Sequence, residues 1–177
     1  APGLGIGYVP EDRLSEGLFL ERSLTDNITV ADVDGLAQGI LLSAEKLTRT
    51  AAGWLSELDI AAESPQIPAK NLSGGNQQRV VLAKWLQTKP RLLILNCPTV
   101  GVDVGSKSQI HEEVKKLARS GIGIIVISDD IGEILTLCSR VLLMKNGRVV
   151  RELLSSETTV AQLEADVISG EEGRCAG

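Results

Sequence analysis

The chain has 177 residues, of which 43% are hydrophobic and 23% are charged, and its net charge is −5 at pH 7. This length supports one sizeable hydrophobic core with room for a small second subdomain. Aromatic residues make up only 2% of the chain and acidic residues outnumber basic ones, which argues against a nucleic-acid-binding surface with clustered Lys and Arg and stacking rings.

The cysteines and the apolar runs further limit the class of protein to which the chain can belong. Cys97, Cys138 and Cys175 are odd in number and widely spaced, which indicates neither a disulfide framework nor a zinc site and fits a reducing compartment. Apolar runs such as 122–127 fall far short of the ~20 residues that a membrane span needs, so we expect membrane contact only through a partner. The sequence begins with Ala1 rather than Met and has no segment that reads GxxxxGK[ST], which together suggest a fragment, a cloned subdomain or a gene remnant.

The predicted elements alternate between strands and helices. In chain order we expect a strand at 6–9, a polar loop at 11–20, a helical region at 23–71 with one helix behind a Ser43 cap, a helix at 77–87, a strand at 92–95, a helix at 106–120, a strand at 122–127, a hairpin at 141–150 and a last helix at 159–168. The run 122–127 is apolar on both faces, which predicts a strand buried within a parallel sheet. Asn146-Gly147 between two apolar runs is a specific hairpin signal. This order indicates an α/β domain.

Residues 72–79 read LSGGNQQR and stand directly before a predicted helix. Ser73, Gly74 and Gly75 would leave backbone N–H groups exposed at the helix N-terminus, where unpaired donors and partial positive charge favour an anion. A simple helix cap is the alternative, but it explains Ser73 alone and not the whole run. The segment therefore predicts a loop that can hold phosphate.

The predicted strand at 92–95 ends in Asn96 and Cys97. A nucleotide-hydrolysing α/β protein places a pair of acidic residues here to hold magnesium and orient water. A neutral amide removes the charge that Mg²⁺ prefers, and a thiol is mostly protonated at neutral pH and a poor acceptor. We predict weak magnesium binding and no general-base help, with a nucleophilic Cys97 as the alternative.

Two long motifs resemble those of ATP-binding-cassette (ABC) ATPases. The run LSGGNQQRV is similar to their signature motif, and LLILNCPTVGVD is similar to their Walker B strand and D-loop, in the right order and at the right spacing. The motif sequences resemble those of the bacterial sugar importers whose single ATPase chain fuses two cassettes. The second cassette of these proteins typically contains YxxEDR, LSGGNQQ and GVDVG. This chain has YVPEDR at 8–13 and GVDVG at 101–105. The match runs from Gly5 to about Ile168.

The resemblance implies a partial P-loop-type ABC cassette of the α/β class, with a parallel core sheet, flanking helices, an inserted helical signature subdomain and a C-terminal hairpin. The Walker A strand and loop are absent, because no segment reads GxxxxGK[ST]. The implied division is a strand and Q-loop region at 1–22, the helical signature subdomain at 23–88, the Walker B, D-loop and switch part of the core at 89–168, and a flexible tail at 169–177. The loop 101–108 nearly fits a P-loop, but Asp103 would put negative charge in the phosphate cradle, so we favour the D-loop interpretation.

The resemblance also implies a role for each motif residue. In ABC ATPases two cassettes pair head to tail, and the signature loop of one closes over ATP held by the other. The implied residues that bind nucleotide in trans are Leu72, Ser73, Gly74, Gly75, Asn76 and Gln77, and the implied D-loop residues are Gly101, Val102 and Asp103. Glu11 stands at the Q-loop position. Asn96, Cys97 and Asp129 replace the family's Walker B Asp, catalytic Glu and switch His, so no catalytic residue and no metal site is expected in this chain.

The resulting hypothesis is an ATP-binding subunit, or a fragment of one, of a bacterial carbohydrate ABC importer. Its signature and D-loop would complete a site for ATP with Mg²⁺ on a partner cassette, either the first half of the same protein or a second copy, while the chain alone is inactive. Permease subunits would hold it on the cytoplasmic face of the plasma membrane, with a periplasmic sugar-binding protein as an indirect partner. The alternatives are a fully competent sugar-transport ATPase once the P-loop is present, and a regulatory ABC-like protein unrelated to transport.

Overall fold

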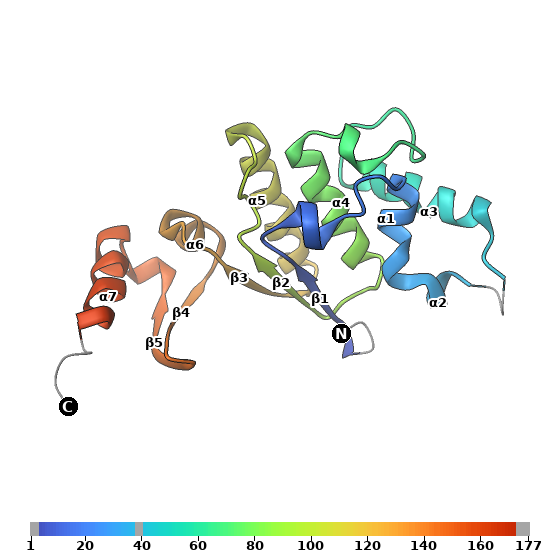
Figure 1. The fold of residues 1–177 in the computed structure, drawn as a ribbon. Helices are drawn as coiled ribbons and strands as arrows, with labels where there is room; N and C mark the ends of the chain where they lie inside the picture. Colours follow the sequence, from blue (N-terminus) through green and yellow to red (C-terminus); the bar gives the residue numbers. More distant parts are fainter. Residues whose placement is uncertain (1–3, 38–40, 173–177) are drawn as a thin grey trace. The chain divides into compact units, whose positions relative to one another are not determined.

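The computed structural model describes residues 4–37 and 41–172, with side chains described as far as residue 168, and the chain divides into two compact units, 1–125 and 126–177. Three strands form one sheet in the order β1 (Ile6–Val9), β2 (Leu92–Asn96) and β3 (Gly123–Ile127), as Figure 1 shows. β1 and β2 run parallel, with Ile6 beside Leu92 and Val9 beside Leu95. The predicted α/β class with a parallel core sheet is therefore confirmed.

The described residues of the first unit form the helices α1 (Leu24–Thr29), α2 (Val33–Leu36), α3 (Ala44–Glu57), α4 (Gly74–Leu86) and α5 (Val104–Arg119). A π-helical turn lies at Arg13–Gly17, and 3-10 turns lie at Val30–Asp32 and Ala69–Asn71. Four of these helices begin after a residue whose side-chain oxygen accepts the backbone N–H three residues further on, namely Ser23, Ser43, Ser73 and Asp103. Within the described ranges, no helix has the length and apolar character needed to cross a bilayer.

Helix α4 lies at the centre of the first unit, in contact with α1, β1 and α5. Its residues 77–83 are all buried, so it is enclosed on every side along two turns. The fully or almost fully buried side chains of this core include Val9, Leu24, Ile28, Val80, Val81, Leu82, Leu93, Leu95 and Ile110. The first turn of α4 is consequently held at a fixed place beside the end of the sheet.

The second unit contains the hairpin of β4 (Arg140–Lys145) and β5 (Arg148–Leu154), followed by a 3-10 turn at Ser155–Glu157. Asn146 and Gly147 have φ of 50° and 75°, as a two-residue type I′ turn requires, so the predicted hairpin is confirmed. Helices α6 (Ile131–Leu137) and α7 (Val160–Glu172) complete the unit and contact each other.

Helix boundaries differ from prediction wherever a cap lies upstream of the apolar pattern. α4 begins at Gly74 rather than at 77, because Ser73 caps it, and α5 begins at Val104 rather than at 106, because Asp103 caps it. The predicted loop at 11–20 contains the π-helical turn, which Asp12 caps. α7 continues to Glu172 and takes up the start of the predicted tail, of which 173–177 lie outside the described residues.

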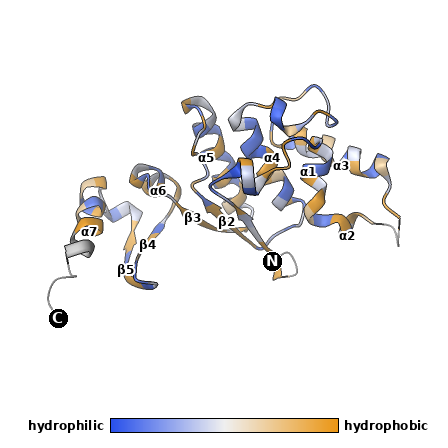
Figure 2. Cartoon of the chain, viewed as in Figure 1, coloured by the Kyte–Doolittle hydropathy of each residue, from blue (hydrophilic) through white to orange (hydrophobic). Residues whose placement is uncertain are grey.

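The prediction that β3 is buried on both faces is wrong. Ile125 is 46% exposed and Ile127 is 50% exposed. β3 is the last strand in the sheet order, so among the described residues no strand pairs with its outer edge, although Figure 2 shows hydrophobic residues along it. An apolar run shows which surface gains from burial, whereas actual burial depends on what packs against that surface.

We expect Leu95→Ala and Ile125→Ala to differ in cost. Leu95 is fully buried, so its truncation should lower the free energy of unfolding by about 2–5 kcal/mol. Ile125 keeps almost half of its surface exposed, so its truncation should cost less than half as much. Urea unfolding followed by tryptophan fluorescence measures both values. Equal losses would contradict the exposure of β3.

Candidate functional site

Ser73 lies exposed at the N-terminus of α4 and organises the first turn. Its Oγ accepts hydrogen bonds from the backbone N of Asn76 at 3.5 Å and from Asn76 Nδ2 at 3.0 Å. The backbone N–H groups of Gly74 and Gly75 belong to the first helical turn and have no partner within the helix. The helix N-terminus therefore keeps the donors and the partial positive charge that favour an anion.

Both glycines of this turn are required by close packing. A Cβ on Gly75 would lie 2.5 Å from Ser106 Oγ, and a Cβ on Gly74 would lie 2.9 Å from the carbonyl oxygen of Gly101 and 2.8 Å from Arg13 Nη2. No larger residue fits without a shift of α5 or of the post-strand loop, by which we mean residues 97–103. We call the first turn of α4, residues 73–76, the signature turn. It is in direct contact with the predicted D-loop.

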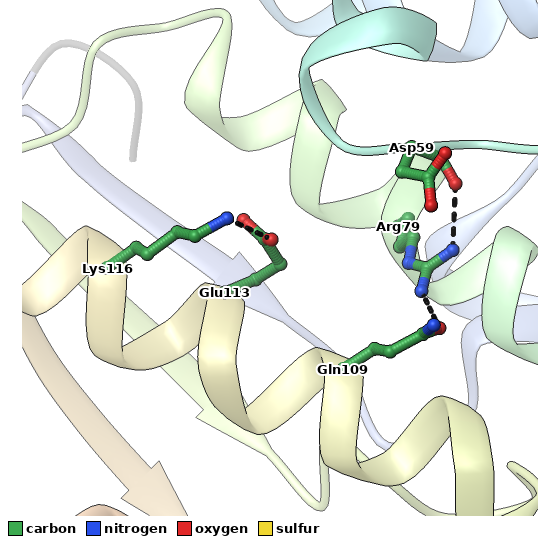
Figure 3. Close-up of polar contacts among 5 residues, drawn as sticks. All are labelled: Asp59, Arg79, Gln109, Glu113 and Lys116. Carbon is green, nitrogen blue, oxygen red and sulfur yellow. Dashed lines mark hydrogen bonds and ion pairs between the residues drawn. The ribbon is translucent and has the colours of Figure 1, made fainter.

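A buried arginine connects this turn to two other elements (Figure 3). Arg79 of α4 is 7% exposed, and its Nη1 donates to the carbonyl oxygen of Asp59 at 2.8 Å and to Asn76 Oδ1 at 3.3 Å. Its Nη2 donates to Gln109 Oε1 on α5. Asn76 Oδ1 also accepts the backbone N–H of Ala61 at 3.1 Å. The loop after α3, the signature turn and α5 therefore share one hydrogen-bond network.

The predicted signature residues do not all lie on the same face. Gln77 is buried, and its Nε2 donates to the carbonyl oxygen of Ala69 at 3.2 Å. Leu72 is half-buried, and its backbone N–H donates to Ala69 as well. Their contacts anchor the turn from within, whereas Ser73 is the exposed member.

An open pocket of about 540 Å³ lies at the end of β1 and β2. Its lining includes Tyr8, Glu11, Asp12, Arg13, Glu16, Asn96, Val100 and Gly101. Asn96 Nδ2 donates to the hydroxyl of Tyr8 at 3.5 Å. The structure therefore brings together the predicted Q-loop residue Glu11, the Walker B position Asn96 and the D-loop residue Gly101. Three carboxylates and a single guanidinium in the lining give it a negative balance.

Other predicted residues of the first unit lie outside the lining of this pocket. Cys97 is half-buried with φ of +47°, and its carbonyl oxygen accepts the backbone N–H of Val100 at 3.1 Å, so it starts the turn of the post-strand loop. Val102 is half-buried within this loop. Asp129 is exposed and belongs to the second unit, where the neighbouring Ser128 Oγ donates to buried Glu133 at 2.6 Å.

Asp103 acts as the cap of α5. Its Oδ1 accepts the backbone N–H of Ser106 at 3.0 Å and its Oδ2 accepts the Ser106 hydroxyl at 2.7 Å. These bonds, that from the backbone N–H first, hold the pKa of the Asp103 carboxyl below its ordinary value. A carboxylate already occupies the place where a P-loop at 101–108 would receive phosphate, so the geometry disfavours that alternative.

Two arginines were not singled out from the sequence. Arg13 stands in the YVPEDR motif and Arg79 ends the signature run, so both carried a motif signal. Their partners Val100, Gly101 and Gln109 lie 30 or more positions away in sequence. Periodicity and capping patterns do not report contacts over that separation.

Comparison with known proteins gives a family and several relatives. A family model described as ABC transporter matches residues 2–100. Ribose import ATP-binding protein RbsA 1 of Mesorhizobium japonicum is 40% identical over 96% of this chain and 33% of its own length. A putative ribose/galactose/methyl galactoside import ATP-binding protein of Rhizobium etli is 45% identical over 88% of this chain and 30% of its own length. The chain thus spans about a third of the length of the curated relatives it matches.

Solved structures show the same fold. The ATP-binding cassette MJ0796, in a dimeric post-hydrolysis state bound to ADP and Pi, superposes with a TM-score of 0.69 at 25% identity, over 85% of this chain and 62% of that one. CbiO1 from Clostridium perfringens, part of the complex cbiONQ, superposes with a TM-score of 0.70 at 25% identity, over 98% of this chain and 65% of that one.

We expect Arg79 and Gln109 to be energetically coupled. Arg79→Met should lower the free energy of unfolding by about 2–3 kcal/mol, because it removes the charge-assisted hydrogen bonds of a buried guanidinium. A double-mutant cycle with Gln109→Leu, measured by urea unfolding, should give a coupling energy of about 1–2 kcal/mol. The matched control is the ion pair of Glu113 and the exposed Lys116 on α5, shown in Figure 3, whose coupling should be smaller. Additive losses for Arg79 and Gln109 would mean that the bond contributes nothing.

We expect the cap of α5 to depend on pH. Because the pKa of Asp103 is lowered in the folded chain, its stabilising effect is fully present above the unfolded value of about 3.9 and is lost as the pH falls through the lower folded value. Asp103→Asn keeps a good cap without a titratable group. The stability advantage of the native chain over Asp103→Asn, measured by urea unfolding from pH 7 to pH 2, should therefore shrink below about pH 4. A difference that is constant with pH would contradict this role.

Proposed function

The chain belongs to the ABC transporter family, and we propose that it is part of the ATP-binding subunit of a carbohydrate importer, in which its signature turn and D-loop complete an ATP site held by a partner cassette. The relatives named as ribose and ribose/galactose/methyl galactoside import proteins support the transport class. In this proposal the partner cassette holds ATP with Mg²⁺, and this chain contributes Ser73, Gly74, Gly75 and Asn76 from the opposite side.

One observation carries the proposal: the signature turn is intact and presents Ser73 to solvent, while the chain's own pocket is unsuited to phosphate. The first turn of α4 offers unpaired backbone N–H groups around Ser73. The pocket at the end of β2 instead has the neutral Asn96, a negative balance of charge, and a guanidinium whose N–H groups donate to Val100 and Gly101. The first surface attracts an anion and the second repels one.

The proposed partners follow from the same arrangement. A dimeric relative bound to ADP and Pi supports pairing between cassettes, here with the first half of a longer protein or with a second copy of this chain. We propose that Glu11 and the helical subdomain at 23–88 face permease subunits, and that residues 89–168 form the Walker B, D-loop and switch part of the core. The sugar-binding protein would act through the permease, and the chain would lie on the cytoplasmic face of the membrane.

A second candidate function is hydrolysis at the chain's own site once a P-loop is supplied. The observation in its favour is the pocket itself, which lies at the carboxyl end of parallel strands, where α/β proteins bind ligands. Glu11 and Asn96 both line it. Against it stand Cys97, which lies outside the lining, and the missing negative charge at Asn96 for a hard cation.

We expect no heat of binding when Mg-ATP is titrated calorimetrically into the purified chain. Adding the chain to the first cassette of a sugar importer should tighten ATP binding to that cassette by about tenfold or more, because the signature turn adds several charge-assisted donors. Ser73→Arg should abolish the gain by filling the space above the N–H groups. The control Ser56→Arg, on an exposed face of α3, should retain it.

Two outcomes would contradict the proposal. Tight binding of Mg-ATP to the isolated chain would place a nucleotide site within it. If Ser73→Arg left the gain in ATP affinity unchanged, the signature turn would not be part of the ATP site. To separate the competent-ATPase alternative, the longer protein with a P-loop is compared with its Asn96→Asp, Cys97→Glu variant by phosphate release. Turnover at the native site equal to that of the variant would favour the alternative.

A further inference from the structure

Arg13 connects two loops that both border the pocket. Its Nη1 donates to the carbonyl oxygen of Val100 at 2.6 Å, and its Nη2 donates to the carbonyl oxygen of Gly101 at 3.0 Å. The two acceptors belong to consecutive residues of the post-strand loop. A planar guanidinium with a fixed fork of donors can span two such oxygens, whereas a lysine ammonium is a point donor. The pairing is therefore specific to arginine.

The segment that carries Arg13 is itself held at both ends. Asp12 caps it, because its carboxylate accepts the backbone N–H groups of Leu14 and Ser15 at 3.1 and 3.2 Å. At the other end, Lys84 Nζ of α4 donates to the carbonyl oxygen of Gly17 at 3.1 Å. We call residues 11–17 the bracket segment, because they join the end of β1, the central helix α4 and the post-strand loop.

The post-strand loop has a backbone that needs support. Cys97 has φ of +47°, a region that costs a residue with a Cβ free energy, and Gly101 has φ of +66°. A Cβ on Gly101 would lie 3.4 Å from Arg13 Nη1 and Nη2, so the guanidinium lies directly against the turn. The same loop ends at Asp103, the cap of α5, and touches Gly74 of the signature turn.

We propose that Arg13 is a positioning residue that fixes the post-strand loop, and through it the signature turn. This inference rests on the proposed function, because the loop and the turn matter to ATP only if they complete a partner's site. Removing the guanidinium releases the carbonyl groups of Val100 and Gly101 and frees the loop beside Gly74. The composite site should then form less readily.

The test combines a local measurement on the chain with a functional one on the complex. Arg13→Met keeps the apolar stem and removes the fork. Amide hydrogen exchange by NMR should become about tenfold faster at Val100 and Val102, whose N–H groups donate to Cys97 and Thr99, while the interior of α3 is unchanged. Arg13→Lys should give a smaller increase, since one ammonium reaches one carbonyl. Arg119→Met, an exposed arginine of α5, is the control.

The chain is expected to raise the ATP affinity of the first cassette. Arg13→Met should reduce this increase about tenfold, and Arg13→Lys should restore part of it. Unchanged exchange at Val100 and Val102 would overturn the positioning role whatever the complex does. A second outcome is that Arg13→Met speeds amide exchange but leaves the gain in ATP affinity unchanged, while Ser73→Arg still abolishes that gain. This would overturn the link between Arg13 and ATP binding and leave the proposed function standing. If the native chain gives no gain, the proposed function fails and this inference fails with it.

Discussion

The close approach of α4 to the post-strand loop is the constraint on which the rest of the structure depends. Gly74 and Gly75 leave no space for a side chain, because Arg13, Gly101 and Ser106 occupy it. This contact fixes where the N-terminus of the buried helix points, and it places the signature turn beside the cap of α5. Since α4 is enclosed by the core along its next two turns, the turn cannot shift without moving the helix.

The two candidate nucleotide-binding surfaces of the chain differ in their charge. The signature turn presents backbone donors at a helix N-terminus, with Ser73 exposed, and the donors need no charged side chain to favour phosphate. The pocket has Asn96 where a carboxylate would hold a cation, and its own carboxylates oppose phosphate. This distribution supports the proposal that the chain completes a site held by another cassette.

Two arginines connect these elements by the same chemistry. Arg79 joins α4 to α5 and to the loop after α3, and Arg13 joins the bracket segment to the post-strand loop. In both cases a rigid fork of donors spans two acceptors at once, which a flexible point charge does not do. The two networks meet the signature turn from opposite sides, through Asn76 and through Gly74.

The sequence by itself determined what depends on near neighbours in the chain: the Ser43 cap, the Asn146-Gly147 turn, the strand that ends at Asn96 and the motif order that gave the family. These follow from periodicity, capping and turn chemistry within a few residues. Only the tertiary structure decided that Ile125 is half-exposed, that Gln77 faces inward and that Arg13 reaches a carbonyl 88 positions away. Such features depend on which segments pack together, and a local pattern carries no information about a distant partner.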